Sequence, residues 1–224
     1  DLHNLNWNSN LLNEFNIPSN SLPIIKPSLH NYGECKNILE GIPITAVLGD
    51  QQASLFGQHC FKKGEVKNTY GTGCFALTNT GDDIIYSKNG LLTTIAYQYG
   101  EKNVKYALEG SVAIAGAAVQ WLRDNLNLIE TSEQVESYAL EEKNNGGVYF
   151  VPAFSGLFSP HWDETARGVL VGLTRYSNRN HICRAVLESV AYQSYDLLEA
   201  MEKDVGIKFN EVKVDGGMVN NNLL

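Results

Sequence analysis

The sequence contains no cluster of basic residues and no apolar run of about 18 residues, the length needed to cross a bilayer. A basic segment followed by an apolar one, the pattern of a secretory signal, is missing too. The 17 Lys and Arg residues against 25 Asp and Glu residues give a net charge of -8, which repels nucleic acids and anionic membranes. We therefore expect no nucleic-acid partner, no membrane segment and a cytoplasmic location.

Closely spaced cysteine pairs are also missing. The four cysteines, Cys35, Cys60, Cys74 and Cys183, form no C-x-x-C pair and have no histidine at metal-ligand spacing. Neither a disulfide framework nor a zinc site is therefore predicted, and the sequence names no metal-binding residue. We expect buried free thiols.

The composition that is present is typical of a globular protein. Hydrophobic residues make up 43% and charged residues 19% of the 224 residues, which is enough chain for one large domain or two small ones. The sequence starts at Asp1 without a methionine and stops at Leu224, just after the first residues of a predicted helix. We expect a piece of a longer protein.

Local patterns change near Pro43. The residues before it are rich in Asn, Ser and Pro and predict loops and short helices. The segment ITAVLGD then predicts a buried strand ending at Asp50, followed by a short helix. The segments VKNTY and CFALTN predict a hairpin with Gly71-Thr72-Gly73 at its turn.

Strands and helices alternate through the remainder of the chain. The interior of one predicted helix contains Gly116, and the longest helix is predicted to have Ser177 or Asn178 as its cap. This alternation indicates an α/β architecture, with ligands at the carboxyl ends of strands. The predicted elements are strands at 91–99, 104–110, 147–154 and 211–215, and helices at 111–126, at 131–142 and after residue 178.

Asp50 and Gln51 are the first candidate site residues. A carboxylate at the end of a buried strand and beside a helix N-terminus can be held in place while ionised, which suits a general base. The same position suits a side chain that caps the helix, because Asp is among the preferred N-cap residues. The residues alone leave both interpretations open.

Three glycine-containing segments are candidates for binding phosphate or nucleotide. The hairpin turn presents backbone N–H groups and the Thr72 hydroxyl, and hairpins of this kind also occur without ligands. Gly116 costs about 1 kcal/mol in a helix interior, so a packed strand or a ligand should require it, and Gln120 lies one turn later on the same face. Gly217 and Asn221 follow a strand at a turn where backbone could approach a ligand, or could simply turn.

Taken together, these segments resemble the FGGY family of carbohydrate kinases from about Pro43 to the last residue. The stretch GVLVGL followed by NHICRAVLES is similar to a family signature, and GDQQA and NTYGTGCF point to its glycerol kinase branch. The other matching segments are NGLLTTIA, LEGSVAIAGAAVQWLRD, VPAFSGLFSPHWDETAR and VDGGMVNNN.

The resemblance implies an actin-like, ribonuclease H-like ATPase fold with two domains and an interdomain cleft. Residues 1–58 would then be the end of the sugar-binding N-terminal domain, and residues 59–224 most of the C-terminal nucleotide-binding domain. Closure of the two domains would assemble the site. Family members of this kind also suggest a homodimer or tetramer.

The resemblance further implies a transferase that phosphorylates glycerol to sn-glycerol 3-phosphate with ATP and Mg²⁺. By matching position, Asp50 would be the general base and a glycerol ligand, and Gln51 a second glycerol ligand. The positions that match nucleotide contacts are Thr72, Gly116, Gln120, Gly217 and Asn221. Two alternatives stay open: a kinase for another polyol or ketose, and an actin-like protein in which nucleotide hydrolysis drives conformational change.

Overall fold

The computed structural model describes all residues from 1 to 224. Helices and strands alternate as the sequence predicts, so the α/β class is confirmed. In chain order the elements are α1 (Ser9–Glu14), η1 (Ser19–Ser21), β1 (Leu29–Glu34), η2 (Asn37–Leu39), β2 (Pro43–Ala46), α2 (Asp50–Gly57), β3 (Val66–Tyr70), β4 (Cys74–Gly81), β5 (Leu92–Tyr99), β6 (Asn103–Val112), α3 (Gly116–Asp124), α4 (Gln134–Leu140), β7 (Tyr149–Val151), β8 (Val169–Val171), α5 (Arg179–Val205), β9 (Lys213–Asp215) and η3 (Gly217–Asn220).

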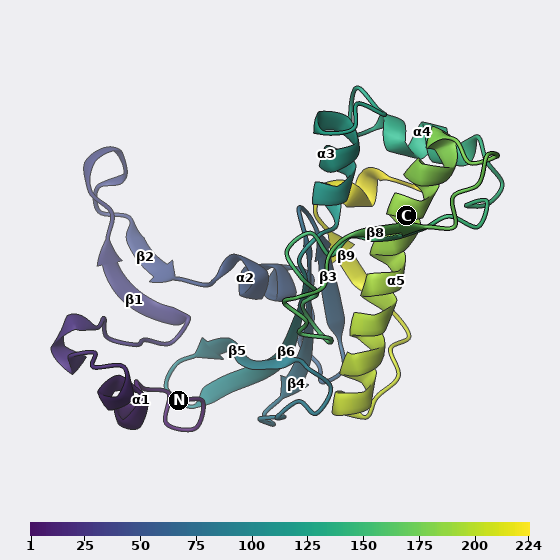
Figure 1. The fold of residues 1–224 in the computed structure, drawn as a ribbon. Helices are drawn as coiled ribbons and strands as arrows, with labels where there is room; N and C mark the ends of the chain where they lie inside the picture. The colour runs from purple at the N-terminus through teal and green to yellow at the C-terminus, as the bar shows by residue number, and fades with distance from the viewer.

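A seven-stranded mixed sheet organises the chain, with strand order β2-β1-β5-β6-β4-β3-β9. The predicted hairpin β3–β4 and the consecutive strands β5 and β6 are antiparallel pairs, whereas β9 pairs parallel with β3. Figure 1 shows α5 along one side of the central strands and α2 on the other side. Strands β7 and β8 form a separate two-stranded sheet.

The long helix α5 carries much of the core. Its N-cap is Asn178, whose side chain accepts hydrogen bonds from the N–H groups of Asn180 and His181, and it ends at Gly206 in the left-handed conformation. One cluster of twelve buried residues fills the space between α5 and the sheet, and a second lies among α3, α4, α5 and β7. A third, smaller cluster lies under α2 around Leu55 and Tyr97.

The first 58 residues depart from the prediction in three respects, one of which is that the strand predicted to end at Asp50 ends at Ala46. Residues 29–34 form β1, a strand that the sequence analysis did not predict. The strand β2 was predicted to be buried, but all four of its residues are exposed. The physical reason is its place at the sheet edge: β2 pairs only with β1, and no helix covers it (Figure 1). The division into domains at residue 58 stays a prediction.

Three of the four cysteines are buried free thiols as predicted, whereas Cys35 is partly exposed. Burial raises the thiol pKa to about 11 for Cys60 and Cys183 and to about 12 for Cys74. No helix combines the length and apolarity that a membrane span needs.

The buried thiols predict a loss of stability at alkaline pH. In the unfolded chain these thiols ionise near pH 9, whereas in the folded chain they stay protonated to about pH 11 or above. Between these two pH values, each buried cysteine therefore lowers the free energy of unfolding by up to about 1.4 kcal/mol per pH unit. In thermal melts, the stability advantage of the wild type over Cys74→Ala should therefore shrink from pH 8 to 10.5. Val112→Ala, from the same cluster, is the control and should show a constant difference; a constant difference for Cys74→Ala would contradict the prediction.

Candidate active site

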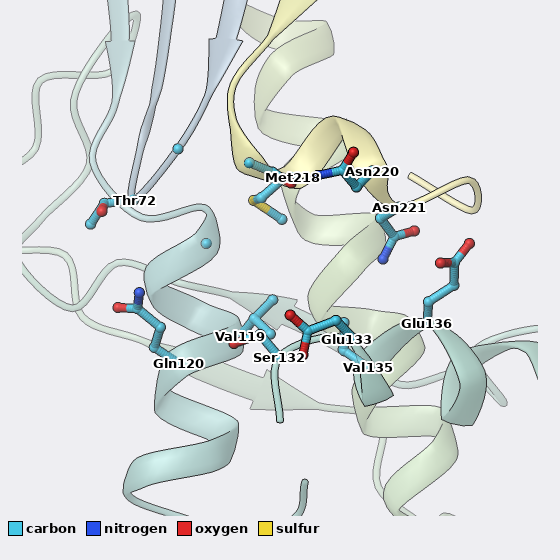
Figure 2. A pocket seen from close by; sticks show the side chains of 13 residues that line it. Thr72, Val119, Gln120, Ser132, Glu133, Val135, Glu136, Met218, Asn220 and Asn221 are labelled. Carbon is cyan, nitrogen blue, oxygen red and sulfur yellow. Dashed lines mark hydrogen bonds between the residues drawn. The ribbon is translucent and has the colours of Figure 1, made fainter. Parts of the chain in front are cut away.

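A pocket of about 370 Å³ opens among the turn of the β3–β4 hairpin, α3, the start of α4 and η3. Figure 2 shows the turn of the β3–β4 hairpin and α3 on one side, with η3 and the start of α4 on the other. The thirteen lining residues are Gly71, Thr72, Gly116, Val119, Gln120, Ser132, Glu133, Val135, Glu136, Gly217, Met218, Asn220 and Asn221.

All five residues that the sequence analysis associated with nucleotide contacts line this one pocket: Thr72, Gly116, Gln120, Gly217 and Asn221. They come from three segments that are far apart in the sequence. The parallel pairing of β9 with β3 brings the last of these segments beside the hairpin. Whether each residue touches a nucleotide stays a prediction, but their convergence on one concave surface is the arrangement that a ligand site requires.

The hairpin turn and α3 are held together by backbone hydrogen bonds. The Gly116 N–H donates to the Gly71 carbonyl at 3.0 Å, and the N–H groups of Ala115 and Ala117 donate to the Thr72 carbonyl at 2.9 and 3.1 Å. The hairpin thus satisfies N–H groups at the start of α3 that the helix itself cannot pair.

Gly116 is the first residue of α3, so its predicted place inside the helix is wrong. The reason is that β6 continues to Val112, which pairs with Cys74, and only then does the chain turn into the helix. A Cβ atom at Gly116 would lie 2.6 Å from the Gly71 oxygen. The close approach of hairpin and helix therefore accounts for this glycine, rather than any role within a helix.

The turn after β9 forms the opposite wall. Gly216 has a φ of 93° and its Cβ would lie 2.3 Å from the Tyr70 carbonyl oxygen, whereas a Cβ on Gly217 would meet nothing within 4 Å. The Asn221 Oδ1 accepts from the N–H groups of Leu223 and Leu224, both at 3.0 Å. Its amide nitrogen is left on the pocket side (Figure 2).

Acidic residues near the start of α4 form the third side. Glu136 Oε1 accepts from the N–H groups of Asn222 at 2.7 Å and Leu223 at 3.1 Å, so it fixes the segment that follows Asn221. Glu133 lies on the pocket side in Figure 2. The sequence predicts only that these residues lie on a helix, because nothing local indicates that this helix faces the turn after β9.

Asp50 and Gln51 do not line this pocket. Asp50 is the exposed first residue of α2, and its carboxylate accepts from the Gln51 N–H at 2.9 Å and from Gln51 Nε2 at 3.3 Å. The N-cap residue is Gly49, and no side chain caps this helix. The alternative interpretation of Asp50 as an N-cap side chain is therefore wrong.

A hydrogen bond joins α2 to the pocket wall. Ser54 Oγ donates to Asp215 Oδ2 at 2.6 Å, and Gln58 Nε2 donates to the same oxygen at 3.3 Å. Burial alone would raise the pKa of Asp215, but hydrogen bonds from Ser54, Thr69 and Gln58 and the charge of Lys67 outweigh it and lower the pKa. Because Asp215 precedes Gly216, the helix that begins with Asp50 is tied to the turn that borders the pocket.

Lys67 is the residue that the sequence analysis missed. It lies in β3 with no exposed surface, and its Nζ donates to Gln51 Oε1 at 2.5 Å, Thr69 Oγ1 at 2.8 Å and the Phe75 carbonyl at 3.0 Å. Burial lowers its pKa to about 8, although Asp215, Glu109 and Asp50 favour the charged form. The sequence contains no signal for it, because Lys67 lies between Val66 and the polar Asn68 in the first strand of a predicted hairpin.

The chain contains no group of three or more His, Cys, Asp or Glu side chains that could hold a metal ion. Mg²⁺ is usually bound through one or two carboxylates together with substrate phosphates, so it does not require such a group. The residues present therefore fit a metal that arrives with a nucleotide better than a resident metal centre.

Comparisons with known proteins agree with the family resemblance seen in the sequence. Residues 66–224 match the C-terminal domain of the FGGY family of carbohydrate kinases. The chain is 57% identical to the glycerol kinases of Methylobacterium radiotolerans and Chloroflexus aggregans over 223 and 224 residues. These alignments cover 100% of the chain and 44% and 45% of the two relatives, so the chain spans less than half of their length.

Solved structures agree with this assignment. The crystal structure of Plasmodium falciparum glycerol kinase with ADP superimposes with a TM-score of 0.89 at 41% identity, over 99% of this chain and 45% of that one. A ligand-bound xylulose kinase from Lactobacillus acidophilus has a TM-score of 0.80 at 23% identity, over 98% and 45%, and this shows a shared fold alone. The chain therefore has the actin-like, ribonuclease H-like ATPase fold of sugar kinases and belongs to the FGGY family of carbohydrate kinases.

Proposed function

We propose that the full-length protein transfers the γ-phosphoryl group of ATP to glycerol, giving sn-glycerol 3-phosphate and ADP. The observation that carries the proposal is the convergence of Thr72, Gly116, Gln120, Gly217 and Asn221 on one pocket tied to the helix of Asp50. The 57% identity to proteins named glycerol kinase supports glycerol as the acceptor.

The charge distribution of the pocket suggests how ATP lies in it. One end is built of Gly71, Thr72, Gly116 and Gly217, where backbone can approach phosphate oxygens closely. The other end has the carboxylates of Glu133 and Glu136, which would repel phosphates. We therefore place the phosphates at the glycine end and the nucleoside towards the amides of Gln120 and Asn221.

Asp50 acts as the general base in this proposal. Its carboxylate accepts the proton of a terminal glycerol hydroxyl while the hydroxyl oxygen bonds to the γ-phosphorus and the bond to the β-phosphate oxygen breaks. ADP leaves with that oxygen. Gln51, which hydrogen-bonds Asp50, is a second glycerol ligand.

Mg²⁺ would arrive with the nucleotide in this proposal, and when bound it would neutralise charge on the transferred group. No lysine or arginine lines the pocket, so no side chain of the pocket supplies the positive charge that a bound metal ion would supply. Cytoplasmic location and a homodimer or tetramer stay predictions.

A polyol panel with the full-length protein tests the proposal. We expect ADP release to depend on glycerol and to exceed that with xylulose, gluconate or polyols other than glycerol by at least about tenfold, which is 1.4 kcal/mol of discrimination. If ADP were released equally fast with and without an acceptor, the result would favour the alternative of an actin-like protein in which nucleotide hydrolysis drives conformational change. A ketose or another polyol that outperforms glycerol would move the protein to another branch of the family.

A further inference from the structure

The environment of Lys67 is unusual for a buried lysine. Its side chain is 0% exposed, yet it belongs to none of the ion pairs of the chain, so no carboxylate oxygen lies within 4.0 Å. Its three donor directions are taken by three neutral oxygens, from Gln51, Thr69 and Phe75. Because burying an ammonium group costs free energy, stability alone does not explain a lysine at this position.

We propose that Lys67 is a positioning residue for phosphoryl transfer: it fixes the Gln51 carboxamide, and through it the Asp50 carboxylate. This inference rests on the proposed function of Asp50. A side-chain amide can turn by 180° and exchange its oxygen and nitrogen. The bond from Lys67 Nζ to Gln51 Oε1 excludes the turned state, so Gln51 Nε2 faces Asp50 Oδ2 at 3.3 Å.

The same lysine connects the base to the phosphate end of the pocket. Lys67 and Thr69 lie on β3, which runs directly into the turn that carries Thr72. The chain of contacts from Asp50 through Gln51 and Lys67 therefore ends on the strand that sets the position of the hairpin. A loss of this connection is expected to displace the carboxylate relative to the phosphorus, and displacements of about 1 Å can cost about 100-fold in rate.

The charged and titratable groups around Lys67 lie on the elements that surround its side chain, except β4, which contributes only the Phe75 carbonyl. They are Asp50 on α2, Cys60 after α2, Glu109 on β6 and Asp215 on β9. Burial lowers the pKa of Lys67 to about 8 in spite of the three carboxylates. The positioning role therefore predicts that kcat/KM for glycerol falls as pH rises through about 8, when the ammonium loses its proton.

A double-mutant cycle tests the inference in the full-length protein. Lys67→Met should lower kcat by about 10- to 100-fold and leave the KM for ATP within about threefold, because the lysine does not line the pocket. Gln51→Met should cost at least as much, because it also removes a glycerol ligand, and the double variant should cost little more than Gln51→Met alone, because both residues act in one chain of contacts. The limb of the profile near pH 8 should be absent in Lys67→Met.

Lys63→Met is the matched control, since it removes a lysine of the neighbouring surface that pairs only with Asp83 and is 41% exposed. An unchanged kcat in Lys67→Met would overturn the positioning role, and so would losses in kcat that add fully in the double variant. In either case, a wild type that phosphorylates glycerol would leave the proposed function intact. A wild type inactive with glycerol would overturn both. If thermal melts show that Lys67→Met is unfolded, Lys67→Gln replaces it. Because Lys67→Gln keeps a donor for Gln51 that does not titrate, it should lose the limb near pH 8 with a smaller loss of kcat, and a limb that persists would overturn the positioning role.

Discussion

Replacing Asp50 with asparagine is expected to lower kcat for glycerol phosphorylation by about 100- to 10,000-fold, the range that a positioned general base contributes. Asparagine has nearly the same size and can keep a hydrogen bond with Gln51, but its amide cannot accept the hydroxyl proton. Because Asp50 lies outside the pocket, the KM for ATP should stay within about threefold, a change below 1.4 kcal/mol.

Steady-state kinetics of the full-length protein with glycerol and ATP varied in turn, together with ATP binding by calorimetry, measure both parts of this expectation. Asp83→Asn is the matched control: it makes the same chemical change at an exposed carboxylate that pairs with Lys63. An Asp50→Asn variant with wild-type kcat would refute the general-base role. A variant that also lost ATP binding would instead indicate that Asp50 supports the pocket structurally.

Elements with strong local signals could be predicted from the sequence. The turn Gly71-Thr72-Gly73 between two alternating segments gives the β3–β4 hairpin, and Asn178 before a long apolar periodicity gives the start of α5. Both signals depend on residues within a few positions of each other. Strand β1 has no such signal, because five of its six residues are exposed and its sequence shows no alternation.

In the candidate site too, some features have a local sequence signal and others do not. Thr72, Gly116, Gln120, Gly217 and Asn221 were expected from glycine turns and the family resemblance, and the structure places them on one pocket. The close contact that requires Gly116 joins it to Gly71 across 45 positions of the sequence, so no local pattern could reveal it.

Lys67 and the acidic side of the pocket were missed for a related reason. Lys67 becomes notable only when α2 folds over β3 and places Gln51 against its ammonium group. Glu136 acquires its partners when the backbone of Asn222 and Leu223 arrives beside α4. These roles depend on tertiary contacts, which cannot be predicted from a charged residue in an otherwise ordinary helix or strand pattern.

The paired glycines after β9 give the second large expected effect. Gly216→Ala should lower the free energy of unfolding by roughly 2–5 kcal/mol, because it combines a positive φ with a Cβ too close to the Tyr70 backbone. The strain cannot be relieved by a side-chain rotation, since the atoms met are the carbonyl and nitrogen of Tyr70. Any relaxation must move the turn, and the KM for ATP should rise with it.

Gly217→Ala separates ligand contact from folding at the neighbouring position. Its Cβ meets nothing within 4 Å, so stability should change by no more than about 0.5 kcal/mol. If ATP phosphates lie against this backbone, the added methyl group should raise the KM for ATP about tenfold or more, equivalent to 1.4 kcal/mol. Melting curves and ATP titrations of both variants measure the contrast. An unchanged KM in Gly217→Ala would place the phosphates elsewhere in the pocket, and an undiminished stability in Gly216→Ala would contradict the close contact with Tyr70.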